Sequence, residues 1–440
     1  MVTDRRTMLA GALVAGIAST ALPGKLAAAT LASRHFPKGF LWGAATAGHQ
    51  VEGNNVASDL WLAERVKPTL FQQPSGDTVN SFELWPADLD LARSFGLNSY
   101  RFSLEWARIE PEPGQFSAAM LDHYARVIEG CHARGLTPIV TFCHFTVPRW
   151  FAARGGWSSP DAADLFARYC DRAARRLAAG MGYATTLNEP NAIDIMADVL
   201  PPQMMGAIAA MNAAAGKACG SEHFRNGMLI EGGDIETARA AQLAAHKNGR
   251  AAIKAARSNL PVGVSLAISD DQAVGANSLR DSKRAKYYGV WLDAAKHDDF
   301  IGVQNYARSQ WTDKGSLPAP PGAVLSQMGA EVYAPSLAGS VRYAHEATGL
   351  PVLVTEHGVG TDDDRIRAGL IPAALRDLHK AVADGVPVLG YVHWSLLDNY
   401  EWIFGYSKSY GLCSVDRATF KRTPKPSTSV LRRIALANAV

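Results

Sequence analysis

Two glutamates end apolar, β-branched stretches of the chain and are its strongest candidates for chemistry. Glu189 follows the segment GYATTLN, and Glu356 follows PVLVT. Neither segment shows a metal-ligand spacing of histidine, cysteine or acidic residues. Such a carboxylate pair suits cleavage of a glycosidic bond. One carboxyl must protonate the leaving oxygen, and the other must be ionised to attack the anomeric carbon or to direct water.

The local sequence favours a different role for each glutamate. Glu189 lies in Asn188-Glu189-Pro190 without a cationic neighbour, and a nearby anion would raise its pKa further, which favours the acid role. Arg101, in YRFSLEW, and the phenol of Tyr306 are candidates to keep Glu356 ionised. These contacts depend on how distant segments meet in the fold.

The elements that must position these residues alternate between short apolar strands and longer amphipathic helices. Helical stretches such as MLDHYARVIEGCHARG repeat apolar residues at i, i+3, i+4 and i+7. Strands are predicted at residues 39–46, 97–104, 136–144, 182–188, 261–268, 299–306, 351–357 and 386–395. Eight strands separated by helices, with no Pro/Gly/Ser linker, favour a single α/β domain, a (β/α)8 TIM barrel over residues 30–440.

A doubly wound open sheet is the structural alternative. It is disfavoured because the first strand is followed by GAATAGHQVEG, which lacks the spacing of a Gly-rich phosphate loop. In a closed barrel, the strand ends meet at one face, where catalytic groups concentrate. That face would collect His144, Asn188, Glu189, Asn305, Tyr306, Glu356 and Trp394.

Composition excludes several classes of protein. The chain has 440 residues, of which 48% are hydrophobic and 19% charged, so it is globular. A net charge of +3 without a basic stripe argues against nucleic acid as a partner. The five cysteines are widely dispersed, and no CxxC or Cys/His spacing indicates a structural metal. We expect no metal and no cofactor. The cysteines still allow one disulfide, and the sequence does not say which two would form it.

The N-terminus has the order of an export signal. Arg5-Arg6 precedes a small-residue apolar run from Met8 to Leu22, and Ala27-Ala28-Ala29 follows. This order predicts a signal peptide over residues 1–29, of the twin-arginine type, and a periplasmic or extracellular mature protein. The apolar run is too short to predict a membrane span after cleavage. An uncleaved anchor is the alternative.

Six stretches follow one another in the order of a known family. They are FPKGFLWGAATAGHQVEG, YRFSLEWARIEPEPG, TLNEPN, the pair NY at 305–306, VTEHGVG and GYVHWSLLDNYEWIFGYSKSYGL. Together they resemble the signatures of glycoside hydrolase family 1, the β-glucosidase family, and they span residues 36 to about 420. The resemblance implies a retaining exo-β-glycosidase that acts through a covalent glycosyl-enzyme intermediate on a small β-glycoside or oligosaccharide.

The same resemblance assigns roles to residues. It makes Glu189 the acid/base and Glu356 the nucleophile. The positions that it matches to sugar binding are Gln50, His144, Asn188, Glu401 and Trp402. Trp394 offers an apolar platform for the ring face of a sugar, Tyr306 a phenol, and Arg101 and Asn305 support the site.

The chain departs from the family pattern at two motifs. The family usually has HWD where this chain has His144-Phe145-Thr146, and TENG where it has Thr355-Glu356-His357-Gly358. The loss of an indole and the gain of a titratable ring beside the nucleophile leave the preferred sugar open. The segment 190–225, rich in Ala and Met, is expected to overhang Glu189 as a wall of the aglycone site.

Three alternative functions stay open on the sequence alone. A 6-phospho-β-glycosidase would use Lys408 and Tyr410 to hold phosphate, although Glu401 would repel the dianion. A transglycosylase would use the same two glutamates. A sugar-binding barrel without catalysis predicts the loss of at least one carboxylate, whereas both are present.

Overall fold

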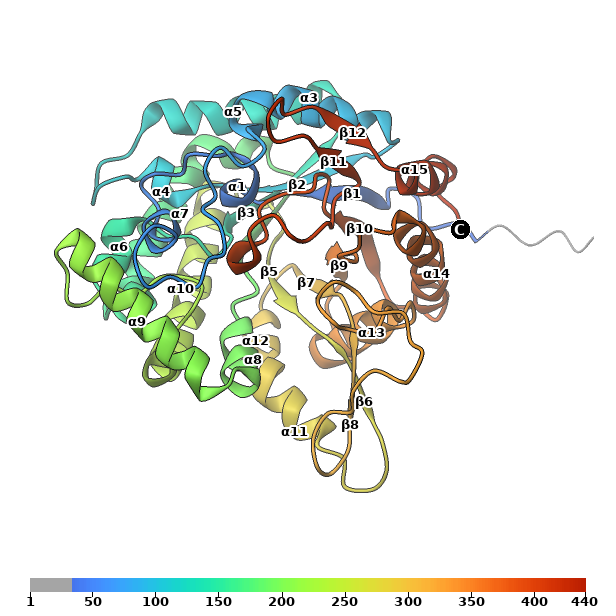
Figure 1. The fold of residues 1–440 in the computed structure, drawn as a ribbon. Helices are drawn as coiled ribbons and strands as arrows, with labels where there is room; N and C mark the ends of the chain where they lie inside the picture. Colours follow the sequence, from blue (N-terminus) through green and yellow to red (C-terminus); the bar gives the residue numbers. More distant parts are fainter. Residues whose placement is uncertain (1–33) are drawn as a thin grey trace, which may run out of the picture. The chain divides into compact units, whose positions relative to one another are not determined.

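The computed structural model describes residues 34–440. The predicted signal peptide at residues 1–29 lies outside the described residues. Within the described part, eight parallel strands close into a barrel in the order β1-β10-β9-β7-β5-β4-β3-β2, because β1 pairs with both β10 and β2. In Figure 1 these strands lie at the centre and helices surround them. The predicted (β/α)8 barrel is confirmed, and the open sheet is wrong.

Each barrel strand lies inside one of the eight predicted ranges. Their bounds are β1 Leu41–Ala45, β2 Ser99–Ser103, β3 Thr137–Cys143, β4 Tyr183–Asn188, β5 Val262–Ala267, β7 Phe300–Asn305, β9 Val352–His357 and β10 Val388–Trp394. These strands are buried on both faces, which explains their continuous apolar runs. Two further two-stranded sheets lie outside the barrel: β6 (Asp270–Ala273) with β8 (Arg308–Trp311), and β11 (Cys413–Val415) with β12 (Arg422–Pro424).

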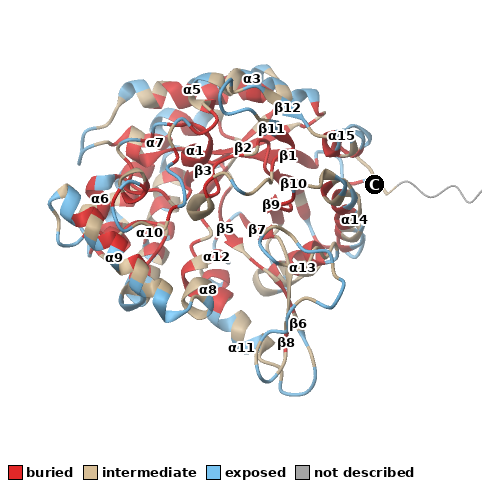
Figure 2. Cartoon of the chain, viewed as in Figure 1, coloured by how far each residue is buried: buried red, intermediate tan, exposed pale blue. Residues whose placement is uncertain are grey.

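Long amphipathic helices form the outer layer. They are α3 (Ser81–Ser94), α5 (Ala118–Ala133), α7 (Ala162–Leu177), α10 (Ile235–Ala256), α12 (Val290–Ala295), α13 (Ser336–Thr348), α14 (Asp364–Ala383) and α15 (Ser427–Ala437). In α5, Leu121, Tyr124 and Ile128 recur on the buried face, and the Ser117 hydroxyl caps the first turn by accepting from the Met120 amide. Figure 2 shows the result: the strands are buried, and the helices expose their outer faces.

Further helical elements follow the strand ends on the side that carries the candidate residues. They are α1 (Gly48–Val51), α2 (Asp59–Ala63), α4 (Trp106–Ile109), α6 (Arg149–Ala153), α8 (Ala192–Val199), α9 (Pro202–Cys219), α11 (Arg280–Arg284) and the short helix η5 (Trp402–Phe404). α8 and α9 directly follow β4, and η5 follows β10. The barrel therefore brings these segments, far apart in sequence, to the face where its catalytic groups are expected.

The interior of the barrel has its own apolar cluster. Leu41, Ile139, Phe300, Leu353 and Val392 belong to it, and Trp394 closes it at the end of β10. All five cysteines are free thiols, so the structure contains none of the possible disulfides. Cys143 is buried in the core, where burial raises the pKa of its thiol above the usual range.

Candidate active site

A bulge at the end of β4 aims Asn188 and Glu189 at the barrel axis. Thr185 pairs with Gly263 and Asn188 pairs with Ser265, so β4 uses three residues where β5 uses two. Glu189 then leaves the strand with a positive φ of 45°, and its amide donates to the Ser265 carbonyl at 2.8 Å. Bulges of this kind re-aim side chains beside active sites.

A second bulge, at the end of β9, places Glu356. Val354 pairs with Val303 and Glu356 with Gln304, which skips Thr355. Leu353 and Glu356 therefore face the same interior, although they are three residues apart. The glycine that follows is required by a close approach, since a Cβ on Gly358 would collide with the Trp394 carbonyl. The motif thus fixes the strand end that carries the carboxylate.

Glu356 is buried and held by two donors. The Arg101 guanidinium donates to its Oε1 at 2.5 Å, and the Tyr306 hydroxyl donates to its Oε2 at 2.6 Å. Burial raises the pKa of Glu356, whereas Arg101 and then Tyr306 oppose this rise by stabilising the carboxylate. The two residues that the sequence proposed as partners of Glu356 do meet it.

Glu189 has a contrasting environment. Among the described residues, no side chain hydrogen-bonds to its carboxyl. Burial, followed by the negative charge of Glu356, raises the pKa of Glu189 to about 8, and Arg101 only partly offsets this rise. At neutral pH Glu189 is therefore a neutral acid beside a carboxylate that is held by an arginine and a phenol.

Asn188 is oriented by donors on both sides of its oxygen. Arg101 and Gln304 both donate to its Oδ1 at 2.6 Å, so its amide group points the other way, 3.3 Å from His144 Nε2. Burial, together with the Arg101 charge, lowers the pKa of His144 well below its usual range, and the ring stays neutral. These contacts present an N–H donor and an imidazole in fixed directions.

Several buried polar atoms in this region have no partner among the described residues. They are Gln50 Oε1, His144 Nδ1, Gln304 Oε1 and Glu401 Oε1. Gln50 is anchored through its nitrogen, which donates to the Tyr400 carbonyl at 2.8 Å. Unpaired buried polar atoms are costly, so a cluster of them indicates a polar ligand. Sugar hydroxyls would satisfy such atoms.

Aromatic rings form a stacked wall beside these polar atoms. The His144 ring lies 5.7 Å from Trp394 and 6.1 Å from Trp402, with an angle of 15° between the planes in each case. Phe145 packs edge-on against Trp402 at 5.4 Å.

Glu401 lies close to this wall. Burial and the Glu356 charge raise the pKa of Glu401 to about 8, and the Trp394 indole opposes this rise.

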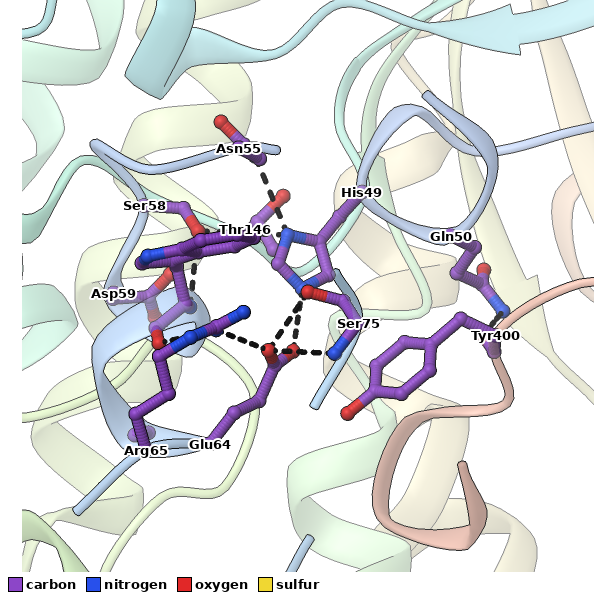
Figure 3. Close-up of polar contacts among 12 residues, drawn as sticks. His49, Gln50, Asn55, Ser58, Asp59, Glu64, Arg65, Ser75, Thr146 and Tyr400 are labelled. Atoms are coloured by element: carbon purple, nitrogen blue, oxygen red, sulfur yellow. Dashed lines mark hydrogen bonds and ion pairs between the residues drawn. The ribbon is translucent and has the colours of Figure 1, made fainter. Parts of the chain in front are cut away.

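A buried hydrogen-bond network around His49 adjoins this wall through Trp402. Figure 3 shows the contacts of the network itself. His49 Nε2 lies 2.9 Å from Glu64 Oε1, while Ser75 donates to Glu64 Oε2 through its amide and its hydroxyl, at 2.9 and 2.7 Å. The His49 ring stacks on Trp402 with ring centres 5.9 Å apart and an angle of 2°. The network therefore fixes the plane on which Trp402 rests.

Two side chains near the glutamates point away from them. The Asn305 side chain turns out of the barrel, donating to the Ile268 carbonyl and to Ser340 of α13, at 3.0 and 2.8 Å. It fixes the end of β7 but does not reach the glutamates. The His357 ring also faces away, 3.0 Å from the Tyr391 hydroxyl, and burial lowers its pKa to about 3. It is an uncharged ring that adds no titratable group beside the sugar.

Gln304 and the pair His49–Glu64 also belong to the site, although the sequence motifs did not point to them. The position of Gln304 could have been predicted, because side chains alternate along a strand. If Tyr306 faces the barrel interior, Gln304 faces it too and Asn305 does not. His49 and Glu64 could not be predicted in this way, since a polar pair fifteen residues apart, in α1 and at the end of α2, matches no sequence pattern. No group of residues within the described range 34–440 has the arrangement of a metal site.

Comparison with known proteins gives one consistent result. The model of glycosyl hydrolase family 1 matches residues 32–223 and 323–440. A β-glucosidase of an Agrobacterium species is 31% identical, with 90% of this chain and 94% of the relative covered. The crystal structure of β-glycosidase BGL167 superposes with a TM-score of 0.87 at 43% identity, covering 92% of this chain and 98% of that chain. The β-glucosidase of Thermotoga maritima in complex with glucoimidazole gives a TM-score of 0.80 at 25% identity, covering 92% and 100%.

The chain belongs to glycosyl hydrolase family 1. Its activity is therefore the hydrolysis of β-linked O-glycosides with retention of configuration, as the motifs predicted, and the phosphoglycosidase, transglycosylase and sugar-binding alternatives are less well supported. Its partner is a glycoside substrate. None of the helices in the described part of the chain is long and apolar enough to cross a membrane.

The pKa values predict the pH dependence of this activity. An acid must be protonated to act, so kcat/KM is expected to fall as pH rises through about 8, the pKa of Glu189, and to fall at low pH when Glu356 becomes protonated. Glu401 has a similar pKa, so the loss of activity at alkaline pH could follow the titration of either glutamate. With a glycoside whose leaving oxygen needs a proton, such as an alkyl or 4-nitrophenyl glycoside, wild type should show this loss at alkaline pH and Glu189→Gln should not. A loss of kcat/KM kept at the same pH in the variant would assign it to Glu401.

Proposed function

We propose that Glu356 is the nucleophile and Glu189 the general acid and base of this β-glycosidase. The observation that carries this assignment is the contrast between the two carboxyls: Glu356 accepts hydrogen bonds from Arg101 and Tyr306, whereas no side chain of the described residues bonds to Glu189. An ionised carboxylate suits attack on carbon, and a neutral carboxyl suits proton donation.

Glu356 and Glu189 together account for every bond and proton that changes in the two steps of the reaction. Glu356 attacks the anomeric carbon while the bond to the aglycone oxygen breaks, and Glu189 gives its proton to that oxygen. A glycosyl ester results, so the Glu356 charge is lost and its contribution to the raised pKa of Glu189 disappears. Glu189 is then ionised and takes a proton from water, which attacks the same carbon and frees Glu356. Two inversions give net retention.

The remaining residues would bind the sugar. Unpaired acceptor oxygens on Gln50 and Glu401 receive hydroxyl donors, and the stacked face of Trp394 and Trp402 covers the ring. Asn188, oriented by Arg101 and Gln304, presents its N–H to the 2-hydroxyl, a contact that strengthens in the transition state.

A panel of 4-nitrophenyl β-glycosides that differ only in the sugar tests the proposed substrate. We expect the glucoside, the galactoside or both to be cleaved with release of the β-anomer, as seen by proton NMR during the first minutes. Absence of turnover with every sugar would overturn the proposal. Release of the α-anomer would exclude a glycosyl ester at Glu356.

Glu401 provides a sharper prediction about the sugar. Its unpaired oxygen should accept from the 4- and 6-hydroxyls, so Glu401→Ala is expected to lower kcat/KM for unphosphorylated glycosides by about 2–3 kcal/mol of transition-state stabilisation. Lys408 lies over the Phe404 ring and donates to the Gln327 carbonyl at 3.1 Å, so it already has a partner.

A phosphate site would give the opposite result. Wild type would then prefer the 6-phosphorylated glycoside, and above a pH of about 8, where Glu401 is ionised, Glu401→Ala would improve that substrate by removing repulsion. Measuring kcat/KM for both substrates with both enzymes separates the two outcomes.

We also propose that the mature enzyme acts outside the cytoplasm. The arginine pair, the short apolar run and the Ala-rich end of residues 1–29 support this. Fractionation of cells that express the full chain, with N-terminal sequencing of the exported form, should place cleavage near Ala29. An uncleaved, membrane-associated form would support the anchor instead.

A further inference from the structure

An apolar cavity of about 240 Å³ adjoins the candidate active site. Glu401, Trp402 and Tyr410 line one side of it. The Tyr410 ring lies 5.8 Å from the Tyr306 ring, whose hydroxyl binds Glu356. The cavity is thus continuous with the residues proposed to hold the sugar.

The two sides of this cavity differ in chemistry. Its polar lining residues, Glu401, Lys408 and Tyr410 with the Trp402 indole, all come from one segment, 401–410. The lining outside this segment comes from α8, α9 and the residue after α8, and from Leu70, Met228, Leu229 and Met328, and within the described chain it consists of apolar side chains alone. A second sugar unit placed there would lose its water without gaining hydrogen bonds, which is unfavourable.

Methionines make up half of the apolar lining outside residues 401–410. Met196 on α8, Met204 on α9 and Met228 line it together with Leu200 and Ile208. Methionine side chains are flexible and polarizable, and they adapt to apolar ligands of irregular shape. This wall corresponds to the Ala- and Met-rich segment that was expected to overhang Glu189.

Exposed apolar side chains lie next to one of the lining residues in sequence. Met328 lines it from the loop between β8 and α13 and is 47% exposed, and on the same loop Val324 and Leu325 are 52% and 49% exposed. Three neighbouring exposed apolar side chains next to an apolar cavity indicate a path for a hydrocarbon group rather than scattered surface residues.

We propose that this cavity is the aglycone site and that it is built for an extended hydrocarbon aglycone, such as the chain of a long alkyl β-glycoside, rather than for a second sugar. This inference rests on the proposed placement of the sugar at Glu401 and Trp402. Met228 lines both this cavity and the small pocket around Glu189. An aglycone whose oxygen lies beside Glu189 would therefore extend into the apolar cavity.

A homologous series of alkyl β-glucosides tests the inference, because methyl to octyl alcohols differ little as leaving groups. Below the micelle concentration, kcat/KM is expected to rise about two- to four-fold per methylene up to hexyl or octyl, as burial of each methylene allows. The kcat/KM for octyl glucoside should be higher than that for cellobiose. In the double variant Met196→Gln with Met204→Gln, the octyl-to-methyl ratio should fall at least about ten-fold.

Met205→Gln is the matched control. Met205 neighbours Met204 on α9 but packs against the core instead of lining the cavity, so the octyl-to-methyl ratio should stay within about two-fold of wild type. The ratio is independent of the folded fraction, so a loss of stability does not obscure it. A flat alkyl series, a preference for cellobiose, or an equal response of the control would overturn the inference. The alkyl series carries the sugar that the 4-nitrophenyl panel shows to be cleaved, and if no glycoside of that panel is cleaved, the proposed function fails instead.

Discussion

Glu356→Ala is expected to lower turnover of every glycoside by on the order of 10⁴-fold or more, because no glycosyl ester can form without the nucleophile. The Arg101 guanidinium would remain buried and lose its carboxylate partner. Glu356→Gln keeps the shape of the side chain and should lose activity to the same extent. Circular dichroism of both variants checks that the fold survives.

Azide supplies the diagnostic part of this prediction. A small anion can occupy the space left by the carboxylate and attack the anomeric carbon from the same face. A single displacement then converts an activated β-glycoside into the α-glycosyl azide, and NMR identifies that product. Wild-type rates in Glu356→Ala, or a β-azide as product, would remove Glu356 from the proposed role.

Glu189→Gln is expected to have an effect that depends on the leaving group. Loss of a general acid costs about 10²- to 10⁴-fold where the leaving oxygen needs a proton, as in an alkyl glycoside. A dinitrophenolate leaves without one, so its departure should be little affected, and hydrolysis of the glycosyl-enzyme becomes limiting with a lowered KM.

The measurement is a plot of log kcat/KM against the pKa of the leaving phenol for wild type and Glu189→Gln. The variant should show a much steeper dependence. Azide should accelerate its turnover of dinitrophenyl glycosides and yield the β-glycosyl azide, because it replaces water without needing a base. Parallel plots would assign the acid to another residue.

The barrel could be predicted from the sequence because its strands carry a strong local signal. Strands such as β5 and β9 are continuous apolar runs between polar helical segments, as burial on both faces requires. The positions of Glu189 and Glu356 at strand ends followed from the same pattern. The two bulges did not, because a one-residue register shift depends on pairing with a neighbouring strand.

Contacts between distant residues explain the rest of what the sequence could not predict. Arg101 and Glu356 are 255 positions apart, and their ion pair exists only because β2 and β9 belong to one barrel. Asn305 was expected near the site, although alternation along β7 turns it outward. The apolar cavity has no motif, since its walls come from α8, α9, Met228, Met328 and residues 401–410.

The most direct test of the central claim is to trap the covalent intermediate on Glu356. In a 2-deoxy-2-fluoro-β-glucoside with dinitrophenolate as leaving group, fluorine slows both steps by destabilising the oxocarbenium-like transition state, and the good leaving group keeps the first step faster than the second. Mass spectrometry of the inactivated protein should show one added fluoroglucosyl group, and peptide fragmentation should place it on Glu356. No adduct, or an adduct on another residue such as Glu189, would contradict the mechanism.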